Sequence, residues 1–307
     1  MLLGIGLSSF AALLLELALT RLFSVVLFYH FAFLAISIAL LGLGAGGVFA
    51  YLGKNSLNRI ETRSLAASLC CLNALAIPVV LEIVLHVPVS LELSWTNLLR
   101  LTAMYLAAAV PFLLTGLLFS VVFARETSTI TRLYGADLLG GALACLSVVP
   151  LLNWIGGPNA ILFAGMAMAI AGYIWADSGA RKKVAASLAA ALILVIAVNH
   201  SGRFIDVIYA KGMFRGKSWV EFARWNAISR VEVDRQGDTG KAIVLAACTR
   251  QRSAPAGRVR HHWSGRGSRR PARRREWQPQ RHCYRNQPDY RNLHHARSLR
   301  RLFLPSL

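Results

Sequence analysis

The stretch that most constrains this chain is LYGADLLGGALACLSVVPLLNW, at positions 133–154. An apolar helix of about 20 residues, rising about 1.5 Å per residue, is as long as the hydrocarbon core of a bilayer is thick. Asp137 is the one charged residue in the stretch and lies near its start. Gly140 and Gly141 follow a turn later, where small residues allow a second helix to approach closely. The sequence therefore predicts a membrane-embedded helical block.

Similar apolar stretches recur along the first 200 residues. The predicted spans are 2–27, 31–52, 64–87, 98–123, 133–154, 157–176 and 184–198. Helices are expected because backbone polar groups in lipid must be satisfied within each segment. The N-terminus lacks the basic region and the cleavage site of a secretory signal, so we interpret it as the first span. We predict an all-α polytopic bundle of about seven transmembrane helices, multi-pass in a bacterial inner (plasma) membrane, with the lipid bilayer as its partner.

Composition divides the chain into three parts. Of its 307 residues 55% are hydrophobic, yet its formal net charge is +20. These two properties rarely belong to one compact domain, and they separate when the chain is divided near residue 200. We expect a transmembrane domain at 1–200, the start of a soluble domain at 201–250, and an Arg-rich tail at 251–307.

Basic residues cluster in alternate loops between the predicted spans, which are expected to be cytoplasmic. These are Lys54, Arg59 and Arg63, then Arg125 and Arg132, then Arg181, Lys182 and Lys183. With seven spans, the segment after the last span lies on the side of the membrane opposite the basic loops. Arg203, Lys211, Arg215 and Lys217 come soon after the last span and favour the cytoplasmic side instead. The two signals conflict, so the sequence leaves the side of the soluble part open.

Three ionisable residues within the predicted spans are the candidate intramembrane site: Glu16, Arg21 and Asp137. Charges are costly in lipid and often mark a polar site or an ion path. Pairing within or between helices, or placement at the membrane interface, is the simpler explanation, since Arg21 and Asp137 both lie near span ends. The LGLGAGG run at 41–47 resembles a nucleotide loop, but it lies inside an apolar span without a preceding strand. Close helix packing is the expected role of its glycines.

After residue 199 the pattern changes from apolar runs to alternation. Val231 and Val233 alternate with Arg230, Glu232 and Asp234, which is the period of a half-buried strand. The GDTG sequence at 237–240 is a turn signal, and KAIVLAA at 241–247 is a second short strand. A β-hairpin that opens a soluble domain is therefore predicted.

Three stretches together resemble the membrane-bound spermidine synthase-like family. They are YGADLLG at 134–140, GGPNA at 156–160 and RWNAISRV at 224–231. Their order and spacing are also similar to those of the family, and the resemblance covers residues 1 to about 245. Members join a multispan domain to an aminopropyltransferase domain. The resemblance implies a Rossmann-like domain after the hairpin, which moves an aminopropyl group from decarboxylated S-adenosylmethionine to an amine such as putrescine.

Such a domain needs a Gly-rich turn, an acidic residue for the ribose hydroxyls and a carboxylate for the attacking amine. None of these stands in the chain as written, so the sequence offers no catalytic, cofactor-binding or metal residues. Residues 251–307 contain fifteen Arg, no Lys and two acidic residues, without apolar periodicity. We expect this segment to be disordered and the chain to be inactive as an aminopropyltransferase.

GC-rich coding DNA in the wrong reading frame yields this kind of composition. A shift of one nucleotide through 261–270 permits I-I-G-P-G-G-G-R-D, a strand followed by a Gly-rich loop. The same shift permits E-I-N from 285–287, about 20 positions after the glycines, where a ribose-binding acid is required. It also permits F-A-D-Y-S from 299–303. We hypothesise a frameshift between about residues 244 and 261.

Two other classes of function stay open at this point. One is a transporter or channel-like bundle with Glu16, Arg21 and Asp137 as its polar centre. The other is a genuine basic tail that binds anionic lipid or nucleic acid. The tail has no recognisable RNA-binding module, and its His pairs at 261–262 and 294–295 lack the spacing of a metal site. We do not expect nucleic acid to be a partner.

Overall fold

The computed structural model describes residues 1–27, 31–89, 94–201, 204–210, 213–214, 220–226, 230–236, 240–245 and 248–250. By its internal contacts the chain divides into Met1–Ala256 and Gly257–Leu307. All described residues belong to the first unit. The predicted disorder of 251–307, and most of the predicted turn at 237–240, lie outside the described residues.

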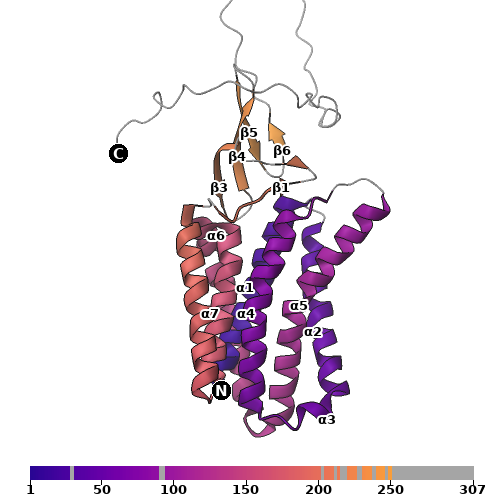
Figure 1. The fold of residues 1–307 in the computed structure, drawn as a ribbon, viewed down its shortest axis with the longest axis vertical. Helices are drawn as coiled ribbons and strands as arrows, with labels where there is room; N and C mark the ends of the chain where they lie inside the picture. The colour runs from indigo at the N-terminus through magenta and orange to yellow at the C-terminus, as the bar shows by residue number, and fades with distance from the viewer. Residues whose placement is uncertain are drawn as a thin grey trace, which may run out of the picture. The chain divides into compact units, whose positions relative to one another are not determined.

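The described part of the first unit is dominated by a helical bundle (Figure 1). Its helices are α1 (Leu2–Val26), α2 (Ala32–Leu52), α3 (Lys54–Leu57), α4 (Thr62–His86), α5 (Trp95–Arg125), α6 (Ile130–Trp175) and α7 (Gly179–Val198). Two 3-10 turns, η2 (Thr127–Thr129) and η3 (Asn199–Ser201), follow α5 and α7. Among the described residues, five helical segments are long and apolar enough to cross a membrane: Leu2–Val26, Phe33–Leu52, Thr62–His86, Trp95–Arg125 and Thr127–Trp175. The prediction of a membrane protein built on apolar helices is confirmed.

Helix α6 contains two helical legs joined at Gly156. This glycine has φ 81°, a left-handed conformation that interrupts the helix. The first leg begins, and the second leg ends, beside the start of α1. A Cβ atom on Gly6 would contact Ala136 of the first leg, and one on Gly4 would overlap Trp175 of the second leg. The chain therefore reverses direction at Gly156. The sequence predicted separate spans at 133–154 and 157–176, and the structure places the break between them at this residue.

Glycines set the closest helix crossings. A Cβ atom on Gly46 of α2 would overlap the backbone of Leu113 in α5, and one on Gly116 of α5 would overlap the backbone of Leu43. Gly140 of α6 meets the backbone of Gly6 in α1 in the same way. The predicted packing role is confirmed for Gly42 and Gly46 of the 41–47 run and for Gly140, while Gly44 faces open space. Backbones at this distance gain dispersion contacts that longer side chains would prevent, and this drives helix association in lipid.

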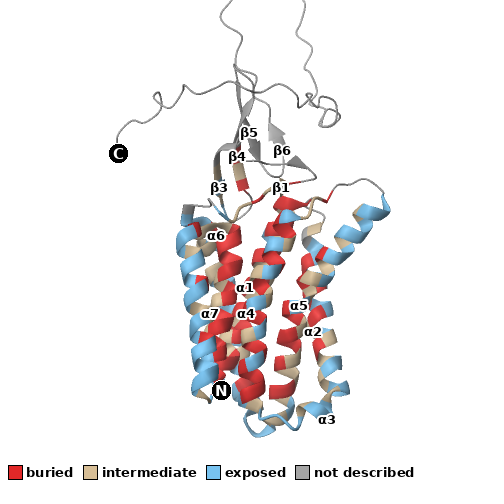
Figure 2. Ribbon diagram, viewed as in Figure 1, coloured by how far each residue is buried: buried red, intermediate tan, exposed pale blue. Residues whose placement is uncertain are grey.

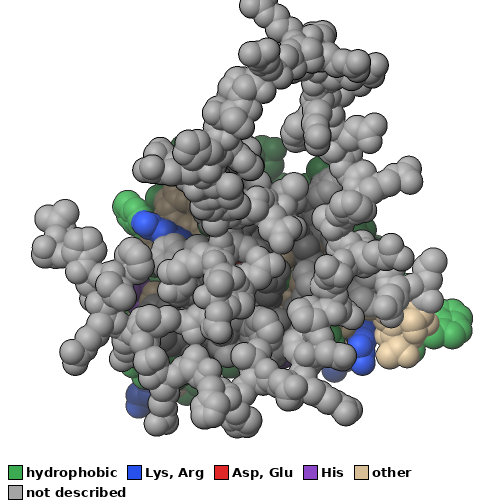
Figure 3. Space-filling model, turned by 90° about the horizontal axis from the view of Figure 1, so that it is seen from above, with side chains coloured by type: hydrophobic (Ala, Val, Ile, Leu, Met, Phe, Trp, Pro, Cys, Tyr) green, Lys and Arg blue, Asp and Glu red, His purple; other side chains and the backbone are tan. Residues whose placement is uncertain are grey.

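Buried side chains line the inside of the bundle, and many exposed ones are apolar (Figure 2). Phe23, Phe112 and Trp175 are among the large side chains that are almost fully buried. Leu146 and Leu194 are 74% and 64% exposed, which is unfavourable in water and suits a lipid-facing surface. From above, hydrophobic side chains and separate Lys or Arg side chains of the described residues are in sight near the margins of the view (Figure 3).

Two antiparallel sheets follow α7 in the described residues. One pairs β1 (Tyr209–Ala210) with β2 (Met213–Phe214). The other has the order β3 (Val220–Trp225), β4 (Arg230–Gln236), β5 (Gly240–Leu245), β6 (Cys248–Arg250). In the pair β4–β5, Val231 lies opposite Leu245 and Gln236 opposite Gly240. The predicted hairpin is therefore present as β4 and β5, while the flanking strands β3 and β6 were not predicted.

Candidate functional site

The three candidate intramembrane residues lie at different depths in the bundle. Ser9 Oγ donates a hydrogen bond of 2.9 Å to the backbone carbonyl of Asp137. Asp137 is therefore level with Ser9, about 10 Å along α1 from Glu16. Arg21 is exposed, and Glu16 and Asp137 are half-buried. Glu16 and Arg21 point about 140° apart around α1, because each residue turns the helix by about 100°.

Neither carboxylate makes an ion pair with Arg21 within the described part of the chain. The structure thus does not bring Glu16, Arg21 and Asp137 into one site. A different polar cluster lies between α4 and α5. Asn73 Nδ2 donates to the carbonyl of Pro111 at 3.0 Å and to Thr115 Oγ1 at 2.9 Å. All three residues are buried, so these bonds join two helices where water is absent.

Further contacts occur where the strands meet the bundle. Trp225, at the end of β3, lies against the reversal of α6. A Cβ atom on Gly156 would lie 3.0 Å from the indole, and one on Gly157 would lie 2.8 Å from it. No larger residue fits beneath the indole without moving it. Two stretches that share the family resemblance, 156–160 and 224–231, are therefore in contact although they are far apart in sequence.

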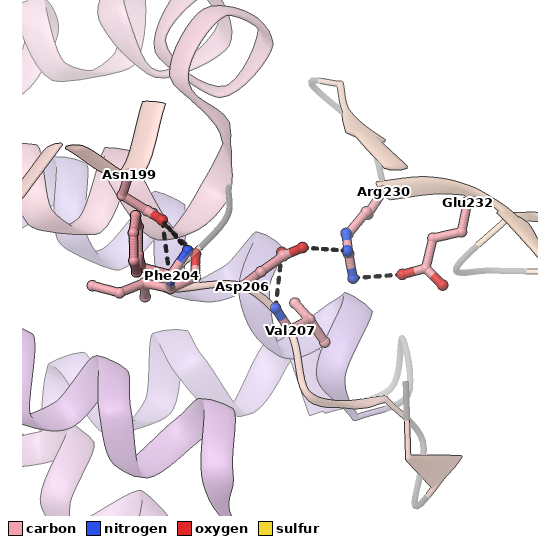
Figure 4. A network of polar contacts seen from close by, with 7 residues as sticks. Asn199, Phe204, Asp206, Val207, Arg230 and Glu232 are labelled. Carbon is pink, nitrogen blue, oxygen red and sulfur yellow. Dashed lines mark hydrogen bonds and ion pairs between the residues drawn. The ribbon is translucent and has the colours of Figure 1, made fainter. Parts of the chain in front are cut away.

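A pair of asparagines fixes the chain as it leaves α7. Asn199 Nδ2 donates to Asn159 Oδ1 at 2.8 Å and to the carbonyl of Ile205 at 2.9 Å. Asn199 Oδ1 accepts from the backbone N–H groups of Phe204 and Ile205, at 3.1 and 2.8 Å (Figure 4). Asn159, in the second leg of α6, also donates to the carbonyl of Asn199 at 3.2 Å. Every side-chain atom of Asn199 that forms hydrogen bonds is satisfied, so the segment entering the strands has a fixed direction.

Arg230, the first residue of β4, is the centre of a buried ion cluster (Figure 4). Its Nη2 lies 2.6 Å from Asp206 Oδ2, and its Nη1 lies 2.5 Å from Glu232 Oε1. The side chains of Arg230 and Glu232 are only 3% and 7% exposed. Asp206 also accepts a 2.8 Å hydrogen bond from the N–H of Val207. Burying a charged guanidinium costs desolvation free energy, and the carboxylates that pair with its charge compensate for that cost.

This cluster was missed by sequence analysis because strand alternation does not reveal which face is buried. Two valines alternating with charged residues ordinarily predict buried valines. The structure instead buries Arg230 and Glu232 and leaves Val231 half-buried. The sequence did contain one signal for this ion cluster. Arg230 and Glu232 are two residues apart and so lie on one face of the strand, and charged residues are rarely buried unless they are paired.

The arrangement suits attachment rather than chemistry. The two carboxylates of the ion cluster already pair with the Arg230 guanidinium, and no nucleophile lies next to a base among these described groups. Within the described residues, no group of three or more His, Cys, Asp or Glu side chains is placed to hold a metal ion. No protein-family model, curated protein or solved structure matches the chain.

Proposed function

We propose that this chain is the membrane domain, with the first strands of the attached domain, of a membrane-bound spermidine synthase-like protein. The contact of Trp225 with Gly156 and Gly157 carries this proposal. Two of the stretches that define the resemblance form one packed junction, which gives their spacing a physical reason. The ion cluster of Arg230, the penultimate residue of the third stretch, lies at the same junction.

The chain as written lacks the donor-binding part of such an enzyme. The resemblance implies aminopropyl transfer from decarboxylated S-adenosylmethionine to a polyamine acceptor. The Gly-rich loop and the carboxylates for this reaction are expected beyond residue 250, where the reading frame is inferred to have shifted. We therefore propose that the encoded chain does not catalyse the transfer.

Resequencing of the gene through the codons for 244–261, followed by an assay, tests this proposal. We expect one missing or extra nucleotide there. The purified chain should transfer no aminopropyl group from decarboxylated S-adenosylmethionine to putrescine, and the protein from the corrected frame should bind this donor. Transfer by the 307-residue chain itself, or a corrected frame without a Gly-rich loop after β5, would contradict the proposal.

The positions of the basic loops support a membrane orientation. Arg125 donates hydrogen bonds to the carbonyls of Leu57 and Ile60, at 2.7 and 2.9 Å. Arg63 pairs with Asp177 at 2.9 Å. These contacts gather three basic loops at the end of the bundle where α1 also begins. The strands contact the other end, at the Gly156 reversal.

Exposed aromatic residues support membrane boundaries near both ends. Tyr134 in the first leg of α6 is 57% exposed, and Trp154 at its far end is 79% exposed. They are separated by about 30 Å of helix, which matches the hydrocarbon thickness. Tyr and Trp favour the two interfaces of a bilayer. We propose seven crossings, with the basic loops in the cytoplasm and the strands on the opposite side.

This orientation is tested with single cysteines in a background without native cysteines. Phe204→Cys, at the strand end, should react with a membrane-impermeant maleimide in intact cells, because Phe204 is 71% exposed. Asn58→Cys, in an exposed basic loop, should react only after permeabilisation. The reverse pattern would place the strands in the cytoplasm. The distinction matters chemically, because it decides on which side the donor and the acceptor must be supplied.

A transporter with Glu16, Arg21 and Asp137 as its centre receives no comparable support. The three side chains lie at different levels and make no ion pair with one another in the described structure.

A further inference from the structure

A surface cavity of about 170 Å³ lies between α4 and the first turns of α7. It is lined by Ala67, Ser68, Cys71, Ala180, Arg181 and Val184. All but two of these side chains are small, and the hydroxyl of Ser68 already donates to the carbonyl of Ser64 at 3.0 Å. The cavity is therefore an apolar groove with one cationic side chain, Arg181.

The groove exists because α7 contacts the bundle along a narrow line. Ala185 and Leu192 are its buried residues, and they lie seven positions apart on one face of the helix. Leu192 packs near Gly165 of α6. The helix therefore lies against the bundle along one stripe, and Ala67 and Ala180 are too short to close the space beside it.

The charges around the groove leave the Arg181 guanidinium available. Asp177, the nearest acidic residue in sequence, is paired with Arg63 at 2.9 Å. Lys182 lies over the ring of Tyr173, 6.0 Å from its centre. Arg181 is exposed, and none of the described residues pairs with its guanidinium. Lys182 and Lys183 add positive charge beside it without entering the groove.

A cation beside an apolar groove is complementary to a phospholipid. Basic sites between helices at the cytoplasmic side are known places for anionic headgroups. We propose that this groove binds one anionic phospholipid. The lipid phosphate lies on Arg181, and part of one acyl chain lies along Ala67, Cys71 and Val184. The Arg181 guanidinium, which no described acidic side chain pairs with, favours a headgroup with net negative charge over a zwitterionic one.

Native mass spectrometry of the delipidated full chain, titrated with phosphatidylglycerol, tests the proposal. The Arg181→Gln variant should bind the first lipid about tenfold more weakly, because one charge-assisted contact to phosphate is lost. Lys183→Gln removes the same charge two residues away, outside the groove, and should stay within about twofold of the original chain. Phosphatidylcholine should bind more weakly than phosphatidylglycerol, and excess inorganic phosphate should not displace the lipid.

A second pair of variants tests the groove itself. Ala180→Leu fills the groove and should weaken the binding of the first lipid as strongly as Arg181→Gln does. Ala186→Leu adds the same volume at an exposed position outside the groove and should have no effect. Equal losses in Arg181→Gln and Lys183→Gln would indicate diffuse electrostatic attraction and overturn the proposal. Full binding by Ala180→Leu would overturn it as well. The Arg181 and Lys183 variants change exposed side chains, so their comparison still decides the question if Ala180→Leu does not fold.

Discussion

Replacing Arg230 with Met is expected to destabilise the strand region by about 3 kcal/mol, the lower end of the range for breaking a buried ion pair. The substitution keeps most of the side-chain volume and removes the positive charge. Glu232, 7% exposed, then keeps its buried negative charge but loses the guanidinium that lies 2.5 Å from its carboxylate. Asp206 is 28% exposed and retains some hydration, which reduces its share of the loss.

The measurement is the rate of proteinase K cleavage within the strands of the purified protein as a function of urea. Arg224→Met is the matched control, because Arg224 is exposed on the neighbouring strand β3, and it should change the stability by less than about 0.5 kcal/mol. Exchanging Glu232 for Leu in the Arg230→Met background should recover stability, since the buried carboxylate is then also gone. Equal effects of the two Arg variants would show that the cluster contributes little.

The substitution Gly46→Leu is expected to separate α2 from α5, with a loss of about 3 kcal/mol, the upper part of the usual overpacking range. A Cβ atom at this position would overlap backbone atoms of Leu113, Gly116 and Leu117. Backbone cannot rotate away as a side chain can, so the whole helix must move. The crossing between α2 and α5 is close because Gly116 lies opposite, against Leu43.

Gly44→Leu is the control for this experiment. Gly44 lies on the same helix two residues earlier, and no atom lies within 4 Å of the position of its Cβ. Unfolding by SDS, followed by far-UV circular dichroism, should give a lower midpoint for Gly46→Leu and an unchanged or higher midpoint for Gly44→Leu. The gain is possible because Leu favours helix more than Gly does. Similar losses in both variants would mean that the added Leu side chain itself, and not the crossing of α2 with α5, determines the effect.

Sequence alone located the helices well, because long apolar runs have few alternatives in lipid. The span predicted at 31–52 is observed as Ala32–Leu52, and that at 64–87 as Thr62–His86. Helix α5 is longer than predicted at both ends, Trp95–Arg125 against 98–123. Its last turn continues because Arg125 bonds to the carbonyls of Leu57 and Ile60, a contact that local hydropathy does not contain.

Which face of each element packs inward could not be predicted. Helix α2 is apolar on all sides, so nothing in the run distinguishes Gly44, which faces open space, from Gly46, which contacts α5. The same limit applies to β4, where the charged face is the buried one. The junction at Trp225 was also missed, because it joins a glycine reversal and a strand end through packing that no local pattern encodes.

The order of synthesis has a consequence for the ion cluster of Arg230. Asp206, Trp225, Arg230 and Glu232 all precede residue 251, where the Arg-rich segment begins. A ribosome therefore completes these partners before that segment is made. The ion pairs of Arg230 with Asp206 and Glu232 are therefore the same whichever reading frame follows residue 250.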